Sequence, residues 1–365
     1  MKVDGIKLNW TAESFRWQRL LNRRRIAFEK LWSCAEIQRG FVQPDNAEDL
    51  NRRAAVVLSG EWCGEILPMA YWFRIADKLS RKAKFCSVRF ATEDEMLKLC
   101  VYGFSKSYKF QVGVIQTQSA RNILDLQGIA QIDIPNPAEW HPIELYSQMA
   151  DFNGKRMELL LCDLQAETDT CLQKSLGMME VNDPLATEVR WQFENHAHHV
   201  TGMRWDHARD FSPRSNLVEA WLKGGIYEVR PLGDLLVDEN ENRISLPRSI
   251  SRYRIDSALS LMSGLDRACS RGFNVNLRET INWRYAVYYL YSRITRLYLE
   301  GVSGTERLQN VDLRSIPIAL PPLNEQIGIA SAIDGIVRCR RKREQEVWRL
   351  KGDIGDQVQK ELYYE

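Results

Sequence analysis

The sequence lacks the features of membrane-spanning and secreted proteins. Its 365 residues contain no apolar run approaching 18 residues, the length that a spanning helix needs. Its first ten residues, MKVDGIKLNW, lack the apolar segment of a secretory signal. Apolar residues make up 44% and charged residues 27%, which is typical of a globular protein with one large domain or two. We therefore predict a globular protein that makes no use of a membrane.

Paired cysteines and a strong net charge are also missing. The eight cysteines form no CxxC pair, and they stand at positions 34, 63, 86, 100, 162, 171, 269 and 339. Scattered single cysteines in a chain of this size indicate reduced, mostly buried thiols and a cytoplasmic protein. The net charge is only +2, so the chain as a whole does not have the strongly basic surface of a protein that wraps nucleic acid. Arginine nevertheless outnumbers lysine by 35 to 15, and its planar fork suits phosphate groups and guanine edges as well as ordinary ion pairs.

The common catalytic signatures are absent. The sequence has no GxxxxGK[ST] loop, no GxGxxG, no GxSxG and no HExxH. No Asp or Glu stands two residues before a Lys, so half of a common nuclease site is missing. Asn136-Pro-Ala-Glu139 lacks the second proline and the aromatic residue of an amino-methyltransferase motif, and we interpret it as a turn. The sequence therefore predicts a chain without a catalytic site or a bound cofactor.

Four of the five histidines cluster at positions 196, 198, 199 and 207. A metal site would need neutral imidazoles that converge with a third or fourth ligand. No cysteine lies within 20 residues of the cluster, and the spacing to Asp206 and Asp210 matches no familiar site. We interpret the cluster as a polar inter-domain segment and predict no metal; a metal site is the alternative.

Internal repetition at long period is the most informative pattern. The segment 126–137 aligns with 310–321 at an offset of 184, so that Ile129, Ile132, Ile134 and Pro137 meet Leu313, Ile316, Ile318 and Pro321. Alternating apolar residues followed by proline predict a short strand in each copy.

Each predicted strand is followed by a long helical pattern, over about 142–176 and about 324–362. Apolar residues recur at spacings of three and four with charges between them, which predicts helices with one apolar stripe. A helix of ~38 residues spans roughly 57 Å. Each helix needs a partner for its stripe, so we predict that the two pack as an antiparallel coiled coil; two unrelated surface helices are the alternative.

The predicted fold class is α/β (α+β), with two pseudo-repeated globular domains that are each followed by a long helix. The boundaries that we predict are 1–137 for the first domain, which has diverged, 138–180 for the first helix, 181–321 for the second domain and 322–365 for the second helix. The join between the halves falls at about 177–203, where Gly, Asn, Asp, Pro and His accumulate.

The end of the second half resembles a known family. Gly304-Thr-Glu-Arg307 reads as a G-T-x-R loop, an apolar strand follows, and Leu320–Gln326 reads L-P-P-L-x-E-Q. This order is similar to the end of a target recognition domain and the start of the spacer helix in the specificity subunits of type I restriction–modification systems. Arg204-Trp-Asp206, Tyr227–Leu236 and the aromatic run Tyr285–Tyr291 also fit that family.

The first half departs from the family pattern. It has Asn136-Pro-Ala-Glu-Trp140 where L-P-P-L-x-E-Q is expected. Its counterpart of the G-T loop, Thr117-Gln-Ser-Ala-Arg121, contains no glycine. The resemblance over 1–180 therefore depends on the internal repeat, and the first half is either a diverged recognition domain or one altered for another task.

The resemblance implies a non-catalytic subunit that reads a bipartite site in double-stranded DNA. Each recognition domain would read one half of the site, and the paired helices would fix the gap. Two methyltransferase (modification) subunits would bring S-adenosylmethionine and methylate adenine, and a restriction subunit would add ATP-driven translocation and cleavage. The alternative is a scaffold whose helix pair docks protein partners and whose first domain no longer reads DNA.

Candidate DNA contacts are polar, basic or aromatic residues close to strand-like runs. Gln can pair with adenine and Arg with guanine, and glycine lets a loop backbone approach phosphate closely. The set in the first half is Lys106, Tyr108, Lys109, Gln116, Gln118 and Arg121. The set in the second half is Arg248, Arg252, Arg254, Asn274, Asn276, Arg278, Ser303, Gly304, Thr305, Arg307 and Gln309. Ordinary solvated surface residues are the alternative.

A second basic group lies in the middle of the second long helix. Arg338, Arg340, Arg341 and Arg343 cover nearly two turns together with Lys342. They would contact either the phosphates of the DNA spacer or an acidic partner surface. The alternative is a solvated face that pairs with Glu344 and Glu346.

Overall fold

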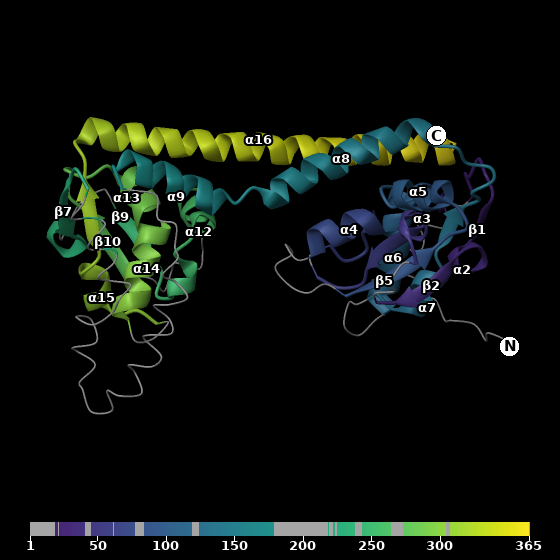
Figure 1. The fold of residues 1–365 in the computed structure, drawn as a ribbon, viewed down its shortest axis with the longest axis horizontal. Coiled ribbons are helices and arrows are strands. Elements are labelled where there is room, and N and C mark those ends of the chain that lie inside the picture. Colours follow the sequence, from purple (N-terminus) through teal and green to yellow (C-terminus); the bar gives the residue numbers. More distant parts are fainter. Residues whose placement is uncertain are drawn as a thin grey trace, which may run out of the picture. The chain divides into compact units, whose positions relative to one another are not determined.

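The computed structural model describes residues 19–20, 22–40, 45–60, 62–76, 84–118, 124–178, 218, 222, 225–237, 243–263, 273–303 and 307–364 (Figure 1). The chain divides into two compact units, Met1–Leu161 with Lys342–Glu365 (unit 1) and Cys162–Arg341 (unit 2). Both units combine helices with small antiparallel sheets, so the predicted mixture of α and β structure is confirmed. None of the helices in the described ranges is long and apolar enough to cross a bilayer.

Unit 1 is built on a four-stranded antiparallel sheet of order β2-β5-β3-β4. Its strands are β2 (Glu36–Arg39), β5 (Phe85–Arg89), β3 (Arg53–Val57) and β4 (Ile66–Pro68). A separate pair joins β1 (Phe28–Lys30) to β6 (Asp133–Pro135), with Glu29 opposite Ile134. All of β3 is buried, because helices cover this part of the sheet.

The helices of unit 1 begin where polar side chains cap their first turns. Thr92 accepts a hydrogen bond from the backbone of Glu95, whose carboxylate accepts one from the backbone of Thr92, so α5 starts with a capping box. The helices are α2 (Leu31–Cys34), α3 (Ala47–Asn51), α4 (Met69–Ile75), α5 (Glu93–Tyr102), α6 (Lys106–Gln118), α7 (Leu126–Ala130) and α8 (Ile143–Leu161).

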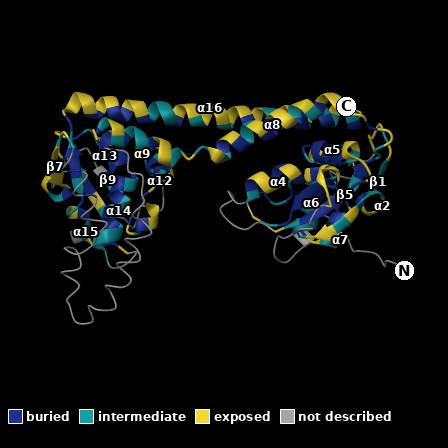
Figure 2. Cartoon of the chain, in the orientation of Figure 1, coloured by how far each residue is buried: buried dark blue, intermediate teal, exposed yellow. Residues whose placement is uncertain are grey.

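The last part of α16 (Leu323–Leu362) packs beside α8 within unit 1 (Figure 1). Gln148 bonds Gln357 at 3.3 Å, and Lys155 bonds Glu346 at 2.7 Å. As the residue numbers rise along α8, the residue numbers of the α16 partners fall, so the two segments run antiparallel. Val347, Ile354, Val358 and Leu362 bury their side chains in the same core as Met149 and Phe152. In Figure 2 buried and exposed residues alternate along α16, as expected for a helix with one apolar side.

Unit 2 contains a three-stranded antiparallel sheet of order β8-β10-β9. Its strands are β8 (Leu236–Val237), β10 (Phe273–Leu277) and β9 (Arg243–Leu246). A separate pair joins β7 (Glu228–Pro231) to β11 (Pro317–Leu320), with Arg230 opposite Ile318.

Aromatic and aliphatic residues from helices and strands throughout the unit form the core of unit 2. Tyr285 and Tyr289 are fully buried, and their hydroxyls donate to the backbone carbonyls of Ala319 and Pro317. The first part of α16 contributes Ile329, Ala330, Ile333 and Val337 to this core. The helices of this unit are α9 (Leu164–Ser175), η3 (Leu232–Leu235), η4 (Ile250–Arg252), α12 (Ile255–Met262), α13 (Trp283–Leu290), α14 (Arg293–Val302) and α15 (Asn310–Arg314).

The single helix predicted over 142–176 is wrong, because two helices occupy it. The chain leaves α8 at Leu161 and starts α9 at Leu164. Asp163 accepts hydrogen bonds from the backbone N–H groups of Gln165 and Ala166, which caps a new helix start. The predicted second helix, about 324–362, agrees with α16. Each predicted helical segment is shared between the two units. The apolar residues of α8 and of the last part of α16 pack in the core of unit 1, and those of α9 and of the first part of α16 pack in the core of unit 2.

The repeated segments 126–137 and 310–321 contain more than the predicted strands. Each begins with a short helix, α7 and α15, and the strands β6 and β11 start three residues after those helices end. The helices arise because Asp125 caps α7 and the Asp312 carboxylate accepts from the backbone of Gln309 ahead of α15. The segment Arg204-Trp-Asp206, which fits the family pattern in sequence, lies outside the described residues.

Candidate nucleic-acid interface

Unit 2 presents a group of arginines that we call the basic edge, made of Arg248, Arg252, Arg254 and Arg307. All four are exposed. They come together because Ser249 forms an isolated antiparallel bridge with Arg307, and the N–H of Leu308 donates to the carbonyl of Arg248 at 2.8 Å. Two segments about 60 residues apart in sequence therefore lie side by side.

A buried tyrosine fixes the position of this edge. Tyr253 is fully buried between the two exposed arginines, and its hydroxyl donates to the carbonyl of Pro247 at 3.1 Å. Its ring stacks on Tyr291 with the centroids 5.6 Å apart. Because the middle residue points into the core, Arg252 and Arg254 extend to solvent on either side of it. The Arg248 guanidinium lies over the ring of Phe273 at 4.7 Å, which holds it at the end of β10.

Asn276 and Arg278 lie apart from the basic edge. Asn276 is paired with Val237 and Arg243 inside the sheet. Arg278 is exposed, and its backbone N–H donates to the carbonyl of Leu235 at 2.9 Å. Phe273, beside Arg248, stands at the other end of β10, and five residues of strand separate it from Arg278 by roughly 16 Å. The structure therefore divides the predicted second set into two places.

The G-T loop is described only at its borders. Gly304 and Thr305 lie outside the described residues. Ser303 is half-buried and ends α14, and Arg307 and Gln309 are exposed just after the gap. The loop thus starts and finishes on fixed elements of unit 2, and Arg307 belongs to the basic edge.

The first set of predicted DNA contacts, in unit 1, was expected close to strands. This expectation is wrong, because most of the set lies on a helix. Residues 106–118 form the helix α6. Tyr108 is 1% exposed, so its ring packs in the core beside Tyr102 and cannot stack on a base. Gln116 is half-buried and donates to the Sγ of Cys63 at 3.2 Å. Lys106 reaches solvent but forms an ion pair of 2.9 Å with Asp356 of α16.

Lys109 is the remaining cation of that set on α6. Its side chain reaches solvent, but desolvation of the ammonium group lowers its pKa, and the positive charges of Lys351 and Lys106 lower it further. Gln118 is the last residue of α6. Arg121 lies outside the described residues, as do the four clustered histidines. Among the described residues, no group of His, Cys, Asp and Glu side chains could hold a metal ion.

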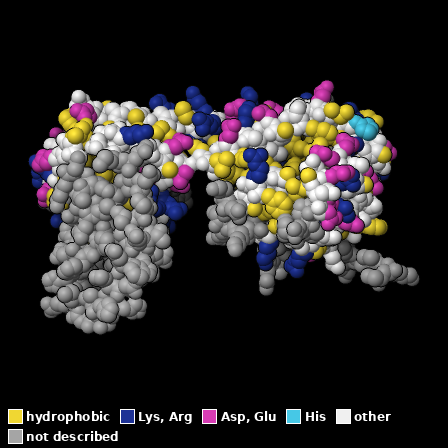
Figure 3. Space-filling model, in the orientation of Figure 1, with side chains coloured by type: hydrophobic (Ala, Val, Ile, Leu, Met, Phe, Trp, Pro, Cys, Tyr) yellow, Lys and Arg dark blue, Asp and Glu magenta, His cyan; other side chains and the backbone are white. Residues whose placement is uncertain are grey.

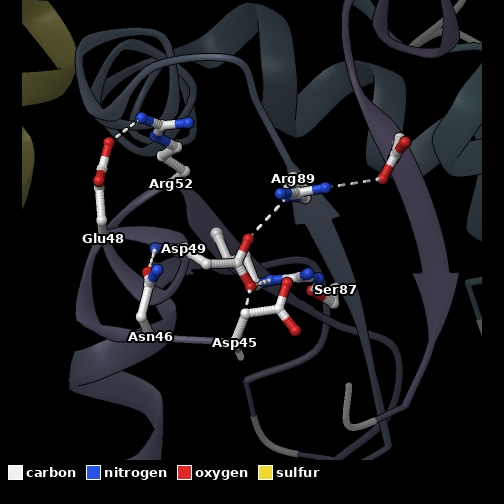
Figure 4. Close-up of polar contacts among 9 residues, drawn as sticks. Asp45, Asn46, Glu48, Asp49, Arg52, Ser87 and Arg89 are labelled. Atoms are coloured by element: carbon white, nitrogen blue, oxygen red, sulfur yellow. Dashed lines mark hydrogen bonds and ion pairs between the residues drawn. The ribbon is translucent and has the colours of Figure 1, made fainter. Parts of the chain in front are cut away.

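Unit 1 uses most of its sheet arginines in a network with carboxylates (Figure 4). Asp49 on α3 is 5% exposed, and its carboxylate bonds Arg53 at 2.9 Å and pairs with Arg89 at 2.7 Å. Arg53 also donates to Ser87 at 3.4 Å. Arg52 pairs with Glu48 one turn earlier. This network ties α3 to β3 and β5, so these arginines differ from the exposed arginines of unit 2.

The pKa of Asp49 reflects this pairing. Burial alone would raise the pKa of the carboxyl, but the hydrogen bond from Arg53 and the charges of Arg53 and Arg89 lower it below its usual value. Asp49 is therefore charged at neutral pH.

The arginines of α16 lie on one continuous helix. Arg338, Arg341 and Arg343 are exposed, and Figure 3 shows Lys and Arg side chains along the part of the surface formed by α16. Arg340 is half-buried and donates to the carbonyl of Cys162 at 3.0 Å, where α8 ends. Its guanidinium is thus at least partly engaged in joining α16 to the start of α9. Glu346 pairs with Lys155 of α8.

Sequence reasoning missed a charged group formed by α8, α16 and the turn before β4. Glu65 pairs with Arg156 and with Lys351, the latter at 2.9 Å. The Arg156 guanidinium lies 3.3 Å from the centroid of the Trp62 ring. Arg156 and Lys351 are 91 and 286 positions from Glu65 in sequence, so no local motif could have indicated the group.

Comparison with known proteins gives one curated relative. No protein-family model matches the chain. Over 132 residues, 35% of its length, the chain is 30% identical to a Methanocaldococcus jannaschii protein named as a type I restriction enzyme MjaX specificity subunit. The match covers 30% of that relative's own length.

Two solved structures align with most of the chain at low similarity. One is the S subunit of a type I restriction–modification system from M. genitalium, with 10% identity, a TM-score of 0.33, and coverage of 93% of this chain and 97% of that one. The other is the HsdS subunit from Thermoanaerobacter tengcongensis, with 12% identity, a TM-score of 0.22, and coverage of 93% and 94%. The curated relative confirms the resemblance that the motifs predicted: in sequence, the chain is similar to the specificity subunits of type I restriction–modification systems.

Proposed function

We propose that this chain is a non-catalytic subunit that recognises DNA sequence for a type I modification or restriction complex. The observation that carries the proposal is the sequence similarity to a specificity subunit, because it agrees with the G-T-x-R and L-P-P-L-x-E-Q motifs. The basic edge of unit 2 supports it, since exposed arginines on a rigid support suit both phosphate and guanine contacts.

The order of elements supports a repeat of two recognition domains. In unit 1 the strand before α8 is β6, and it pairs with β1 near the start of the unit. In unit 2 the strand before α16 is β11, and it pairs with β7. The central strand is β5 between β2 and β3 in one unit and β10 between β8 and β9 in the other. We propose that each unit reads one half of a bipartite site.

The long helices are the proposed spacer. The antiparallel contacts of α8 with α16 in unit 1, and the shared core of unit 2 to which α9 and the first part of α16 both contribute, support an interacting helix pair. In this role the pair sets the gap between the half-sites. The proposed partners are double-stranded DNA, two methyltransferase subunits that bring S-adenosylmethionine, and a restriction subunit that uses ATP. This chain itself binds neither cofactor in the proposal.

The test is to co-express the chain with the methyltransferase encoded beside it and to map methylated adenines. We expect co-purification and methylation at a motif of two defined parts separated by a fixed gap. Replacing Arg307 with Ala should relax one part only, by roughly 1–3 kcal/mol if Arg307 contacts a base edge. A methyltransferase that does not co-purify, or a methylation pattern that is the same without the chain, would reject the proposal and favour the scaffold alternative.

A further inference from the structure

Unit 1 contains a cavity of about 180 Å³ that the DNA-recognition proposal does not use. Parts of β4, α6, α8 and α16 line it, together with the turn before β4. Its size exceeds that of a cavity of about 150 Å³ that holds benzene in another protein. The cavity can therefore accept a small organic molecule.

One side of the cavity is apolar. Ile66, Leu67, Phe104, Val112 and Phe152 contribute to its lining. Phe104 and Phe152 contact each other edge to face at 5.1 Å, so they form a firm aromatic surface. This side would pack against a compact apolar body.

The other side carries more positive than negative charge. Lys109, Arg156 and Lys351 line the cavity with Glu65 as the single carboxylate among its lining residues. Arg156 and Lys351 both bind Glu65, and the two cations lower its pKa although burial would raise it. The side chain of Lys109 has no ion pair or hydrogen bond with a described residue, and the charges of Glu65 and Asp356 act on it together with those of Lys351 and Lys106. An anion at this place would therefore gain attraction without displacing an existing partner.

Tyr108 also contributes to the lining and is 1% exposed. Its hydroxyl is fully enclosed by protein atoms, so it lies behind the lining and takes no part in binding.

We propose that this cavity binds a small organic monoanion with a compact apolar body, of the size of benzoate. The apolar body packs on Phe104 and Phe152, and the anionic group pairs with Lys109. The site is separate from the basic edge of unit 2, and its existence does not depend on the DNA-recognition role.

The test is calorimetric titration of the full chain with three probes. Benzoate carries both features, benzyl alcohol lacks the charge, and inorganic phosphate lacks the apolar body. We expect saturable binding of benzoate, and binding of the other two weaker by about tenfold or more, the change that follows from losing ~1.4 kcal/mol of interaction. Lys109→Gln should weaken benzoate binding about fivefold, as expected for loss of one partly exposed charge pair.

Lys155→Gln is the matched control. It removes one positive charge from α8 next to Arg156, but Lys155 does not line the cavity and pairs with Asp151 and Glu346. Benzoate affinity should stay within about twofold of the unmodified chain in this variant. The proposal would be overturned by no saturable benzoate binding, by equal binding of benzyl alcohol, or by an equal effect of the two lysine substitutions. Phosphate that binds as tightly as benzoate would also overturn it, since the site would then recognise charge alone.

Discussion

The two units place their charged groups differently although their sheets follow a similar order. In unit 1, Asp49 is buried and holds Arg53 and Arg89, so these arginines stabilise the fold. In unit 2, Arg252 and Arg254 are exposed, and no carboxylate of the described residues pairs with them. Arginines that are already paired have little left to offer a ligand. The difference indicates that unit 2 has the better-formed surface for nucleic acid in the described part of the chain.

The two units also differ in the pKa of a buried aspartate, which is lowered in unit 1 and raised in unit 2. Arginine contacts lower the pKa of Asp49 in unit 1. Burial raises the pKa of Asp169 on α9 of unit 2 to about 6, and the hydrogen bonds from the Arg293 backbone and the Gln165 side chain only partly oppose it. The two carboxyls should therefore change the stability of their units in opposite directions as the pH changes.

The largest effect that we expect is from Asp49→Ala. The change leaves Arg53 buried at 4% exposure without its carboxylate. Removing one partner of a buried ion pair costs about 3–5 kcal/mol. Urea denaturation followed by hydrogen exchange should show unit 1 losing this free energy of unfolding. Arg52→Ala is the control, because Arg52 pairs with Glu48 near the surface and its loss should cost about 1 kcal/mol or less.

A second test uses pH to separate the two units. The pKa of Asp169 is raised from 3.8 to about 6 on folding, so the folded state binds the proton more tightly than the unfolded state. Its contribution to stability is present below pH 4 and is lost as the pH rises through about 6, by at most about 3 kcal/mol. Asp169→Asn should remove this loss from the pH profile of unit 2. An unchanged profile between pH 4 and 7 would show that Asp169 is not perturbed.

A smaller effect should come from the close approach of α16 to the rest of unit 1. A Cβ added at Gly355 would lie 2.7 Å from the carbonyl oxygen of Phe104. Gly355→Ala should therefore push the helix away and lower the stability of unit 1 by about 1–3 kcal/mol. Gly352→Ala, one turn earlier, meets nothing within 4 Å and should stabilise the helix by about 0.5–1 kcal/mol. Equal effects of the two substitutions on thermal unfolding would contradict this packing.

Much of the fold could be predicted because the signals were local. The periodicity over 324–362 identified α16 nearly to the residue, since a stripe with spacings of three and four leaves few alternatives. The break at Asp163 was missed because the apolar spacing continues on both sides of it and only the side-chain cap shows the new start. The segment 106–118 was misjudged since polar residues dominate it, yet Tyr108 and Val112 anchor it in the core.

The candidate site was less predictable than the fold. Arg252 and Arg254 could be proposed from sequence, but the bridge between Ser249 and Arg307 that joins them to the G-T loop is a long-range contact. Lys106, a predicted DNA contact, pairs instead with Asp356, and this contact is also long-range in sequence. Single-chain sequence patterns carry no information on such distant pairs.

The most direct test of the account is the salt dependence of duplex DNA binding by three forms of the chain. The unmodified chain should lose affinity as salt is raised, because phosphate contacts release counterions. The double variant Arg252→Gln, Arg254→Gln should show a slope of log K against log salt that is shallower by about 1–2. Arg52→Gln in unit 1 should leave the slope unchanged. Binding that does not respond to salt, or an equal change of slope in both variants, would contradict the assignment of DNA contact to the basic edge of unit 2.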